Sequence, residues 1–259
     1  STFHILPLGK VATAGNALLG LLLRVHNSAI VTTVAVSPPA ALFAQKYYGR
    51  QCRVIPNPIA LASFSSKQRT NTVPTVVFLG RLVERKGSMK LLQAIDHLRR
   101  HGLYDGDFRV ELGGKGELAD DLAAYVVRHD LQDVVTLHGF VAETDKKDFL
   151  SQADIAVFPS TGGESFGISL LEAFAACQGV VLAGNNPGYA SVVPDKRNLI
   201  EPSDTPAFAH TIAKWLNTTS ERQQMSALQK DHVRSFDIGV VGAKYETVYK
   251  QALQTSKQS

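Results

Sequence analysis

The sequence is poor in cysteine. Its 259 residues include only Cys52 and Cys177, which lie far apart, so no disulfide framework is indicated. A reducing, cytosolic setting is expected for such a chain. The sequence also lacks a Cys/His cluster with zinc-ligand spacing and a G-x-S-x-G nucleophile turn. These absences argue against a small zinc module and against a serine hydrolase.

Long hydrophobic runs and a large excess of one charge are also missing. The window 17–36 is apolar, but Arg24 and His26 stand near its middle, and an arginine there costs about 2.5–3.5 kcal/mol on insertion scales. We therefore predict a buried helix over 14–26 and a strand over 30–36. No signal-peptide pattern opens the sequence as given. The net charge of +4 mildly favours anionic partners, although solvated surface charge explains it equally well.

Hydrophobic residues make up 44% of the chain, which is enough for a sizeable core. Short apolar runs bounded by glycine or proline alternate with helical patterns, and such runs are typical of parallel strands buried on both faces. The predicted fold class is therefore α/β, with a Rossmann-like parallel sheet covered by helices. The predicted strands are 75–80, 108–113, 134–139, 154–159, 179–184 and 198–202. The predicted helices are 88–100, 118–129, 206–216, 220–233 and 239–253.

The first part of the chain contains a separate strand–helix–strand pattern. Ser37 can cap a helix whose first turn tolerates proline, and Gly49 can end it. A short strand closed by two prolines follows, and then a polar linker over 60–74. We place a domain boundary near Pro58. The predicted units are 1–58, 59–235 and 236–259.

Ligands of such sheets bind beyond the carboxyl ends of the strands, so the loops there should carry function. "GRLVERKGS" follows the strand 75–80 and places Arg81 and Lys86 beside a helix start. Two cations and free backbone N–H groups predict a phosphate site. An exposed basic loop is the alternative.

The next two strands end in further candidate ligand turns. "GGKGEL" includes Gly114 and Lys115, and its glycines let the backbone approach a ligand. A plain strand-to-helix turn explains this segment equally well. "LHGFV" ends with Phe140 and Val141, which would supply an apolar shelf.

The segment "TGGESFGISLLEAFAAC" at 161–177 places two glutamates in an apolar setting. We expect a helix to begin at Glu164, so that an anion meets the N–H groups of the residues after it: Ser165, Phe166, Gly167 and Ile168. Glu172 would then lie about 12 Å further along the axis. Both carboxylates could accept hydrogen bonds from sugar hydroxyls, with a diphosphate between them. Alternatively, Glu172 pairs with a lysine and Glu164 only caps the helix.

Together, "FLGRLVERKG", "GGKGEL", "LHGFV" and "GGESFGISLLEAFAA" resemble the retaining glycosyltransferases of family 4, which have the two-domain GT-B fold. The likeness runs from about residue 31 to 249. It implies that 1–58 is a remnant of an acceptor-side domain, that 59–235 is a nucleotide-sugar-binding domain, and that 236–259 is a helix that crosses back to the first part. The opening "STFH" is similar to a strand end in phosphatidylinositol mannosyltransferases, where a histidine faces the donor sugar. By that match His4 is an active-site residue, and roughly the first hundred residues of a family member are absent.

The resemblance implies a role for each matched residue. Arg81 and Lys86 would hold the donor diphosphate. Glu164 would contact the transferred sugar and Glu172 the ribose hydroxyls, while the turn 140–141 would lie against the base. The implied reaction moves a hexose from a nucleotide-diphosphate sugar to a hydroxyl acceptor, lipid or glycan, by front-face attack.

The donor, the partners and the activity leave alternatives open. "GGESFGI" with "TFH" favours GDP-mannose, and UDP-glucose-type donors stay open. No cofactor, metal or nucleic-acid partner is expected, and we regard "DGD" at 105–107 as a turn rather than a metal motif. We expect a cytoplasmic protein, with peripheral contact to an anionic inner-membrane face as an option. The rival functions are a GT-B-type nucleotide-sugar epimerase and a non-catalytic nucleotide-sugar-binding fragment.

Overall fold

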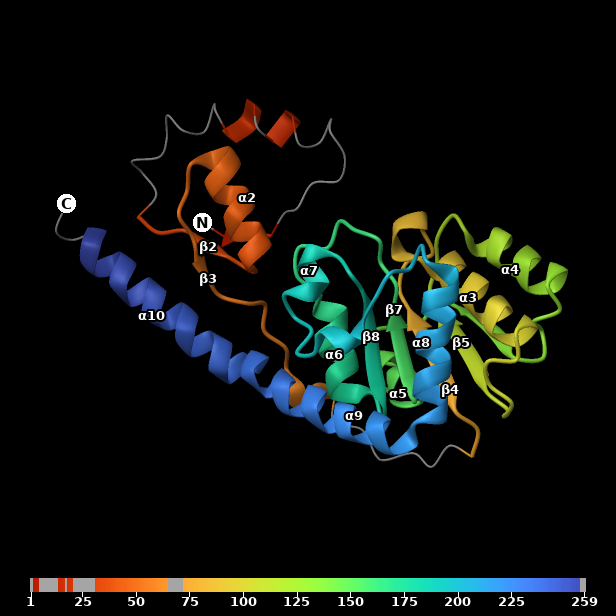
Figure 1. Ribbon diagram of the computed structural model, residues 1–259. Helices are drawn as coiled ribbons and strands as arrows, with labels where there is room; N and C mark the ends of the chain where they lie inside the picture. Colours follow the sequence, from red (N-terminus) through yellow and green to blue (C-terminus); the bar gives the residue numbers. More distant parts are fainter. Residues whose placement is uncertain (1, 5–13, 17, 21–30, 65–71, 257–259) are drawn as a thin grey trace.

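The computed structural model describes residues 2–4, 14–16, 18–20, 31–64 and 72–256. Its larger unit is a parallel six-stranded sheet of order β6-β5-β4-β7-β8-β9 (Figure 1). All six predicted strands are confirmed, with ends trimmed by one or a few residues. Their bounds are β4 Thr75–Leu79, β5 Arg109–Gly113, β6 Val135–Gly139, β7 Ile155–Phe158, β8 Val180–Gly184 and β9 Leu199–Ile200.

Helices cover both faces of this sheet, because neighbouring residues of each central strand point to opposite sides. Val76 of β4 lies in one core cluster, packed under α3 and α8, whereas Val77 lies in the other, packed under α6. The apolar runs of the sequence are thus strands buried on both faces. The helices of this unit are α3 Ser88–Arg100, α4 Ala119–Arg128, α5 Lys146–Ser151, α6 Ile168–Ala176, α7 Pro187–Ala190, α8 Thr205–Asn217 and α9 Thr219–Val233.

A second, smaller parallel sheet has the order β1-β2-β3. Its strands are β1 Thr2–Phe3, β2 Val34–Ala35 and β3 Arg53–Val54, and α2 Pro38–Tyr48 packs against it. The predicted caps of α2 are confirmed. The Ser37 side chain accepts a hydrogen bond from the Ala40 N–H, and Gly49 ends the helix in the left-handed conformation. These elements form the partial second unit that the sequence predicted.

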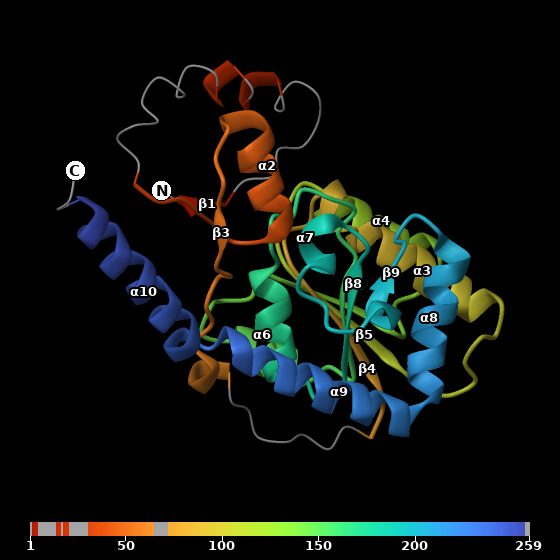
Figure 2. The ribbon, with the colours of Figure 1, turned by 60° about the vertical axis from the view of Figure 1, so that its left-hand side comes forward.

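The last helix, α10 Ile238–Ser256, leaves the large sheet and runs past β3 toward the chain's first residues (Figure 1 and Figure 2). Val241 and Val248 of α10 are buried with Val34 and Ile55 of the small sheet. The backbone at Ile59 also forms a parallel bridge to Asp237, just before α10. The exact domain boundaries stay a prediction, but the return of the chain to its first part is observed.

The structure differs from the predicted elements in a few places. The helix α6 begins at Ile168, not at Glu164, because Gly167 adopts φ +132° just before it. The short helices α5 and α7 were not predicted. The strand expected over 30–36 is reduced to β2. Residues 14–16 and 18–20 of the predicted helix 14–26 are helical, and its other residues lie outside the described ones.

Candidate functional site

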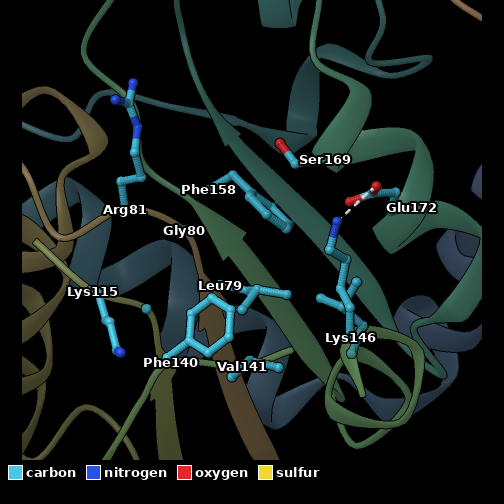
Figure 3. A pocket seen from close by; sticks show the side chains of 12 residues that line it. Leu79, Gly80, Arg81, Lys115, Phe140, Val141, Lys146, Phe158, Ser169 and Glu172 are labelled. Carbon is cyan, nitrogen blue, oxygen red and sulfur yellow. Dashed lines mark hydrogen bonds and ion pairs between the residues drawn. The ribbon is translucent and has the colours of Figure 1, made fainter. Parts of the chain in front are cut away.

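A cavity of about 470 Å³ opens at the carboxyl ends of β4, β5, β6 and β7, beside the start of α6. This is the edge at which parallel sheets bind ligands. Figure 3 shows Arg81 and Lys115 on one side of the cavity and the Lys146–Glu172 pair on the other. The lining residues are Leu79, Gly80, Arg81, Gly114, Lys115, Phe140, Val141, Lys146, Leu150, Phe158, Ser169 and Glu172.

The side of the cavity with Arg81 and Lys115 is basic. Within the part of the chain that the structure describes, neither side chain forms an ion pair. Lys115 Nζ instead lies 4.9 Å from the ring centre of Phe140, whose ring is 65% exposed. Gly114 has φ +152°, and a Cβ there would lie 1.8 Å from the Gly80 carbonyl oxygen. Glycine is therefore required where the β4 and β5 loops touch.

Lys86 and Glu164, predicted from separate loops, meet in the structure. Lys86 Nζ lies 2.8 Å from Glu164 Oε1, and Arg85 Nη1 lies 2.7 Å from the same oxygen. Ser160 Oγ is 3.0 Å from it. Burial raises the pKa of the Glu164 carboxyl, but Lys86, Ser160 and Arg85 together outweigh burial, so the net pKa is lowered. Glu164 is thus held as a carboxylate among cations.

Glu164 does not stand in a helix, so the proposed geometry of two glutamates along one helix is wrong. Among the residues expected to offer N–H groups from a first turn, Ser165 and Phe166 precede α6. The Ser165 carbonyl accepts a hydrogen bond from the Ser37 hydroxyl. The Phe166 side chain is buried, with its ring centre 5.9 Å from that of Phe236. The glycine pair at 162–163 and Gly167 favour a loop here, and a loop lets Glu164 reach Lys86.

The first turn of α6 therefore lies later in the chain than expected. Gly167 and Ile168 mark its start, and the Leu170 N–H already bonds to the Gly167 carbonyl at 3.0 Å. Ser169 on this turn lines the cavity, while Ile168 is 47% exposed. The helix therefore approaches the cavity one turn later than the sequence predicted.

Glu172 lines the cavity from α6 and also pairs with a lysine, which was the alternative left open. Lys146 Nζ lies 3.0 Å from Glu172 Oε1 and 2.7 Å from Glu143 Oε1 (Figure 3). Burial raises the pKa of Glu172, and the shared lysine only partly opposes that rise. Burial also lowers the pKa of Lys146, but its bonds to Glu143 and Glu172 outweigh burial and leave it raised. Glu172 is thus less firmly ionised than Glu164.

His4 follows β1 in the small sheet and is exposed. It does not line the cavity, so its role at the donor sugar stays a prediction. The "DGD" segment 105–107 precedes β5 and lies at the opposite, amino edge of the sheet. Among the described residues no group of three or more His, Cys, Asp or Glu side chains could hold a metal ion. None of the described helices is long and apolar enough to span a bilayer.

Sequence reasoning missed Arg85, Lys146 and Ser160. Arg85 was visible beside Lys86, but a loop gives no period that tells which cation faces a ligand. Lys146 belongs to a six-residue helix, which is too short for hydrophobic periodicity to reveal. Ser160 directly follows the predicted strand 154–159, so its place at the ligand edge was the available signal.

Comparison with known proteins shows the family of the chain. The family described as "Glycosyl transferases group 1" matches residues 62–232, and the chain belongs to that family. Among curated relatives, the phosphatidyl-myo-inositol mannosyltransferase of Mycobacterium tuberculosis is 32% identical over 240 residues. The match covers 88% of this chain and 62% of the relative. The corresponding protein of Propionibacterium freudenreichii is 30% identical, with 88% of this chain and 58% of the relative covered.

Solved structures share the fold. Anabaena Alr3699/HepE in complex with UDP has a TM-score of 0.82 at 18% identity, with 96% of this chain and 71% of that chain covered. The glycosyltransferase of Rickettsia africae has a TM-score of 0.77 at 18% identity, with 97% and 70% covered. The α/β fold of the GT-B type is therefore confirmed.

Proposed function

We propose that the protein is a retaining glycosyltransferase that moves a hexose from a nucleotide-diphosphate sugar to a hydroxyl acceptor. The chain spans 62% of the length of the Mycobacterium tuberculosis relative, so the activity of the whole protein belongs to the proposal. One observation carries it: the carboxyl edge of the sheet brings together Arg81 and Lys115, which form no ion pair among the described residues, Glu172 and the exposed Phe140 in one cavity, with the ionised Glu164 on a neighbouring loop. These are the groups that a diphosphate, a sugar and a base require.

The cations fit the diphosphate. Arg81 faces the cavity without an ion-pair partner among the described side chains, and Lys86 lies in the same loop. A departing diphosphate gains negative charge in the transition state, and cations fixed beforehand stabilise that charge without reorganising. Lys86 would share its charge between Glu164 and the phosphate oxygens.

The two glutamates fit the two sugars of the donor. In this proposal Glu164 accepts hydrogen bonds from the transferred hexose, and Glu172 accepts them from the ribose. The ring of Phe140 with Val141 forms the apolar wall for the base, and the backbone around Gly114 lies between the base and the diphosphate. Ribose hydroxyls would replace part of the Lys146 contact when Glu172 binds them.

We propose transfer with retention of configuration, as the resemblance to family 4 implies. The acceptor hydroxyl would enter on the face from which the diphosphate leaves, and the diphosphate would take up its proton. A carboxylate nucleophile would need a partner carboxyl about 5–5.5 Å away across the scissile bond. Glu164 is instead enclosed by cations, which suits sugar binding rather than attack.

The relatives point to the substrate class. Both curated relatives described above are named phosphatidyl-myo-inositol mannosyltransferase, and a further match is named a GDP-mannose-dependent phosphatidylinositol monomannoside mannosyltransferase. We therefore propose GDP-mannose as donor, with UDP-glucose as the competing choice, and a lipid-linked hydroxyl as acceptor. We also propose that the protein is cytoplasmic and acts at the surface of an anionic membrane, where such an acceptor would lie.

The test combines the whole protein with GDP-mannose or UDP-glucose and a phosphatidylinositol acceptor in vesicles. The proposal expects acceptor-dependent release of nucleotide and a product with the anomeric configuration of the donor, read by NMR. Release of free nucleotide without acceptor, together with an epimerised sugar, would support the epimerase instead. Tight nucleotide-sugar binding without either product would support the non-catalytic alternative.

A further inference from the structure

The turn after β8 contacts the loop that carries Glu164 and fixes its backbone. Asn186 is 4% exposed, and its Nδ2 donates to the Ser160 carbonyl at 3.0 Å. Its Oδ1 accepts from the Tyr189 N–H at 3.1 Å. A Cβ on Gly188 would lie 1.9 Å from the Glu164 carbonyl oxygen, so the two loops are in direct backbone contact. Ser160 and Glu164 therefore sit on a fixed base.

Ser160 reaches from this base to the carboxylate. It is 1% exposed, and its hydroxyl lies 3.0 Å from Glu164 Oε1, 3.0 Å from the Arg85 carbonyl and 3.2 Å from the Gly162 carbonyl. A hydroxyl has only one hydrogen to donate. An ionised carboxylate is a stronger acceptor than a peptide carbonyl, so the hydrogen points to Glu164.

Among the described residues, the donors to the Glu164 carboxylate all contact the same one of its two oxygens. Ser160, Arg85 and Lys86 all contact Oε1, at 3.0, 2.7 and 2.8 Å. Among the described residues no donor contacts Oε2. The Glu164 side chain is 14% exposed, so the carboxylate is largely enclosed yet still meets the solvent side of the site. One oxygen is fixed and the other is available.

We infer that Ser160 and Arg85 are positioning residues, which hold Glu164 by Oε1 so that Oε2 meets a hydroxyl of the transferred sugar. This inference rests on the proposed function and deepens it. A carboxylate fixed by three donors does not lose rotational freedom again when the sugar binds, so its hydrogen bond adds to sugar affinity. The nucleoside diphosphate makes no such contact and should not sense the change.

The test compares nucleotide with nucleotide sugar. Affinities of the chain for GDP and GDP-mannose, and for UDP and UDP-glucose, are measured by calorimetry. The readout is the factor by which the sugar strengthens binding. For Ser160→Ala we expect this factor to fall roughly tenfold, the loss typical of a hydrogen bond to a charged group, with GDP or UDP affinity unchanged. The Ser160 hydrogen bond lowers the pKa of Glu164. When the pH is lowered, Ser160→Ala should therefore lose the sugar factor at a higher pH than the unchanged protein does.

Ser226→Ala is the matched control. Ser226 is a buried serine, 5% exposed, whose hydroxyl donates to the Gln178 carbonyl at 3.3 Å on the far side of the unit. It should leave the sugar factor unchanged. Arg85→Met provides a second variant if Ser160→Ala does not fold, because the Arg85 side chain is 28% exposed and also holds Oε1.

The outcomes separate the two claims. An unchanged protein that binds neither GDP nor UDP would overturn the proposed function and this inference with it. A sugar factor that is present in the unchanged protein and kept in Ser160→Ala or in folded Arg85→Met would overturn the inference alone. Equal losses for nucleotide and nucleotide sugar would make Ser160 merely structural, and would also overturn it.

Discussion

Lys146 Nζ lies 3.0 Å from Glu172 Oε1 in the wall of the cavity at the carboxyl edge of the sheet. The pair joins α5 to α6. Lys146 also forms an ion pair with Glu143, and burial raises the pKa of Glu172 and so disfavours its charged form. A ribose that offers hydroxyls to Glu172 would enter an arrangement that is already shared. We therefore expect that a ligand can rearrange this ion pair.

Replacing Glu172 tests this reading. We expect Glu172→Ala to weaken binding of GDP or UDP at least tenfold, because an oriented acceptor for the ribose is lost. The melting temperature should change little. Titration calorimetry and thermal melts on the same samples check both. If the affinity is kept and the fold collapses, Glu172 is a core ion-pair partner instead.

The pH dependence of stability should differ in sign between the two glutamates. The folded-state pKa of Glu172 is raised above its ordinary value of 4.5, so the stability contributed by its protonated form is lost as pH rises through the folded pKa. Relative to Glu172→Gln, the unchanged protein should therefore lose stability as pH rises above about 4.5. Urea unfolding at a series of pH values measures this difference. A difference that moves in the opposite direction would contradict the assignment.

Glu164 should behave in the opposite way. Its pKa is lowered, so the stability it contributes is present above 4.5 and is lost as pH falls through the folded pKa. Glu164→Gln should cost about 2 kcal/mol at neutral pH, because Arg85 and Lys86 lose their shared carboxylate. The cost should shrink in acid. A cost that does not depend on pH in the same urea series would show that the ionised form is not what the cations stabilise.

Neutralising the loop cations should affect transfer more than stability. Arg81→Met and Lys86→Met in the whole protein are each expected to lower kcat by roughly 10²-fold, because each removes charge that faces the leaving diphosphate. Unfolding midpoints should move little for Arg81→Met, whose side chain is exposed. Near-normal turnover in the double variant would refute the phosphate site.

The exposed ring at the cavity mouth gives a simpler test. Phe140 is 65% exposed, so Phe140→Ala should not destabilise the fold, but it should weaken nucleotide binding by roughly tenfold through lost contact with the base. Val127→Ala is a matched control, because Val127 is 62% exposed on α4. Equal effects of the two changes on nucleotide affinity would contradict the assignment of Phe140 to the nucleotide site.

Much of this architecture was readable from the sequence because its signals are local. Strands such as β4 and β8 are apolar runs bounded by proline or glycine, and a parallel sheet puts their carboxyl ends on one edge. Arg81, Lys115 and Phe140 could be assigned to that edge before their positions were known. Glu164 and Lys86 were each predicted for the same reason.

The contacts between loops were not readable, because they depend on side-chain geometry across the sheet. The sequence "GGESFGI" does not show that α6 begins only at Ile168. Because Glu164 precedes the helix, its side chain can reach Lys86. Lys146 pairs with Glu172 from α5, a helix too short to be predicted from the sequence pattern. Ser160 and Asn186 are in contact because β7 and β8 are neighbours in the sheet. The order of the strands could not be predicted from the sequence.

The central claim is that the carboxyl edge of the six-stranded sheet binds a nucleoside diphosphate through its loop cations. Calorimetric titration of GDP and UDP into the unchanged chain, Lys86→Met and Lys90→Met tests it most directly. Lys90 lies four residues further on, within α3, and forms no ion pair among the described residues. The account predicts that Lys86→Met loses at least tenfold in affinity while Lys90→Met keeps the affinity of the unchanged chain. No binding by the unchanged chain, or equal affinities for the three proteins, would contradict it.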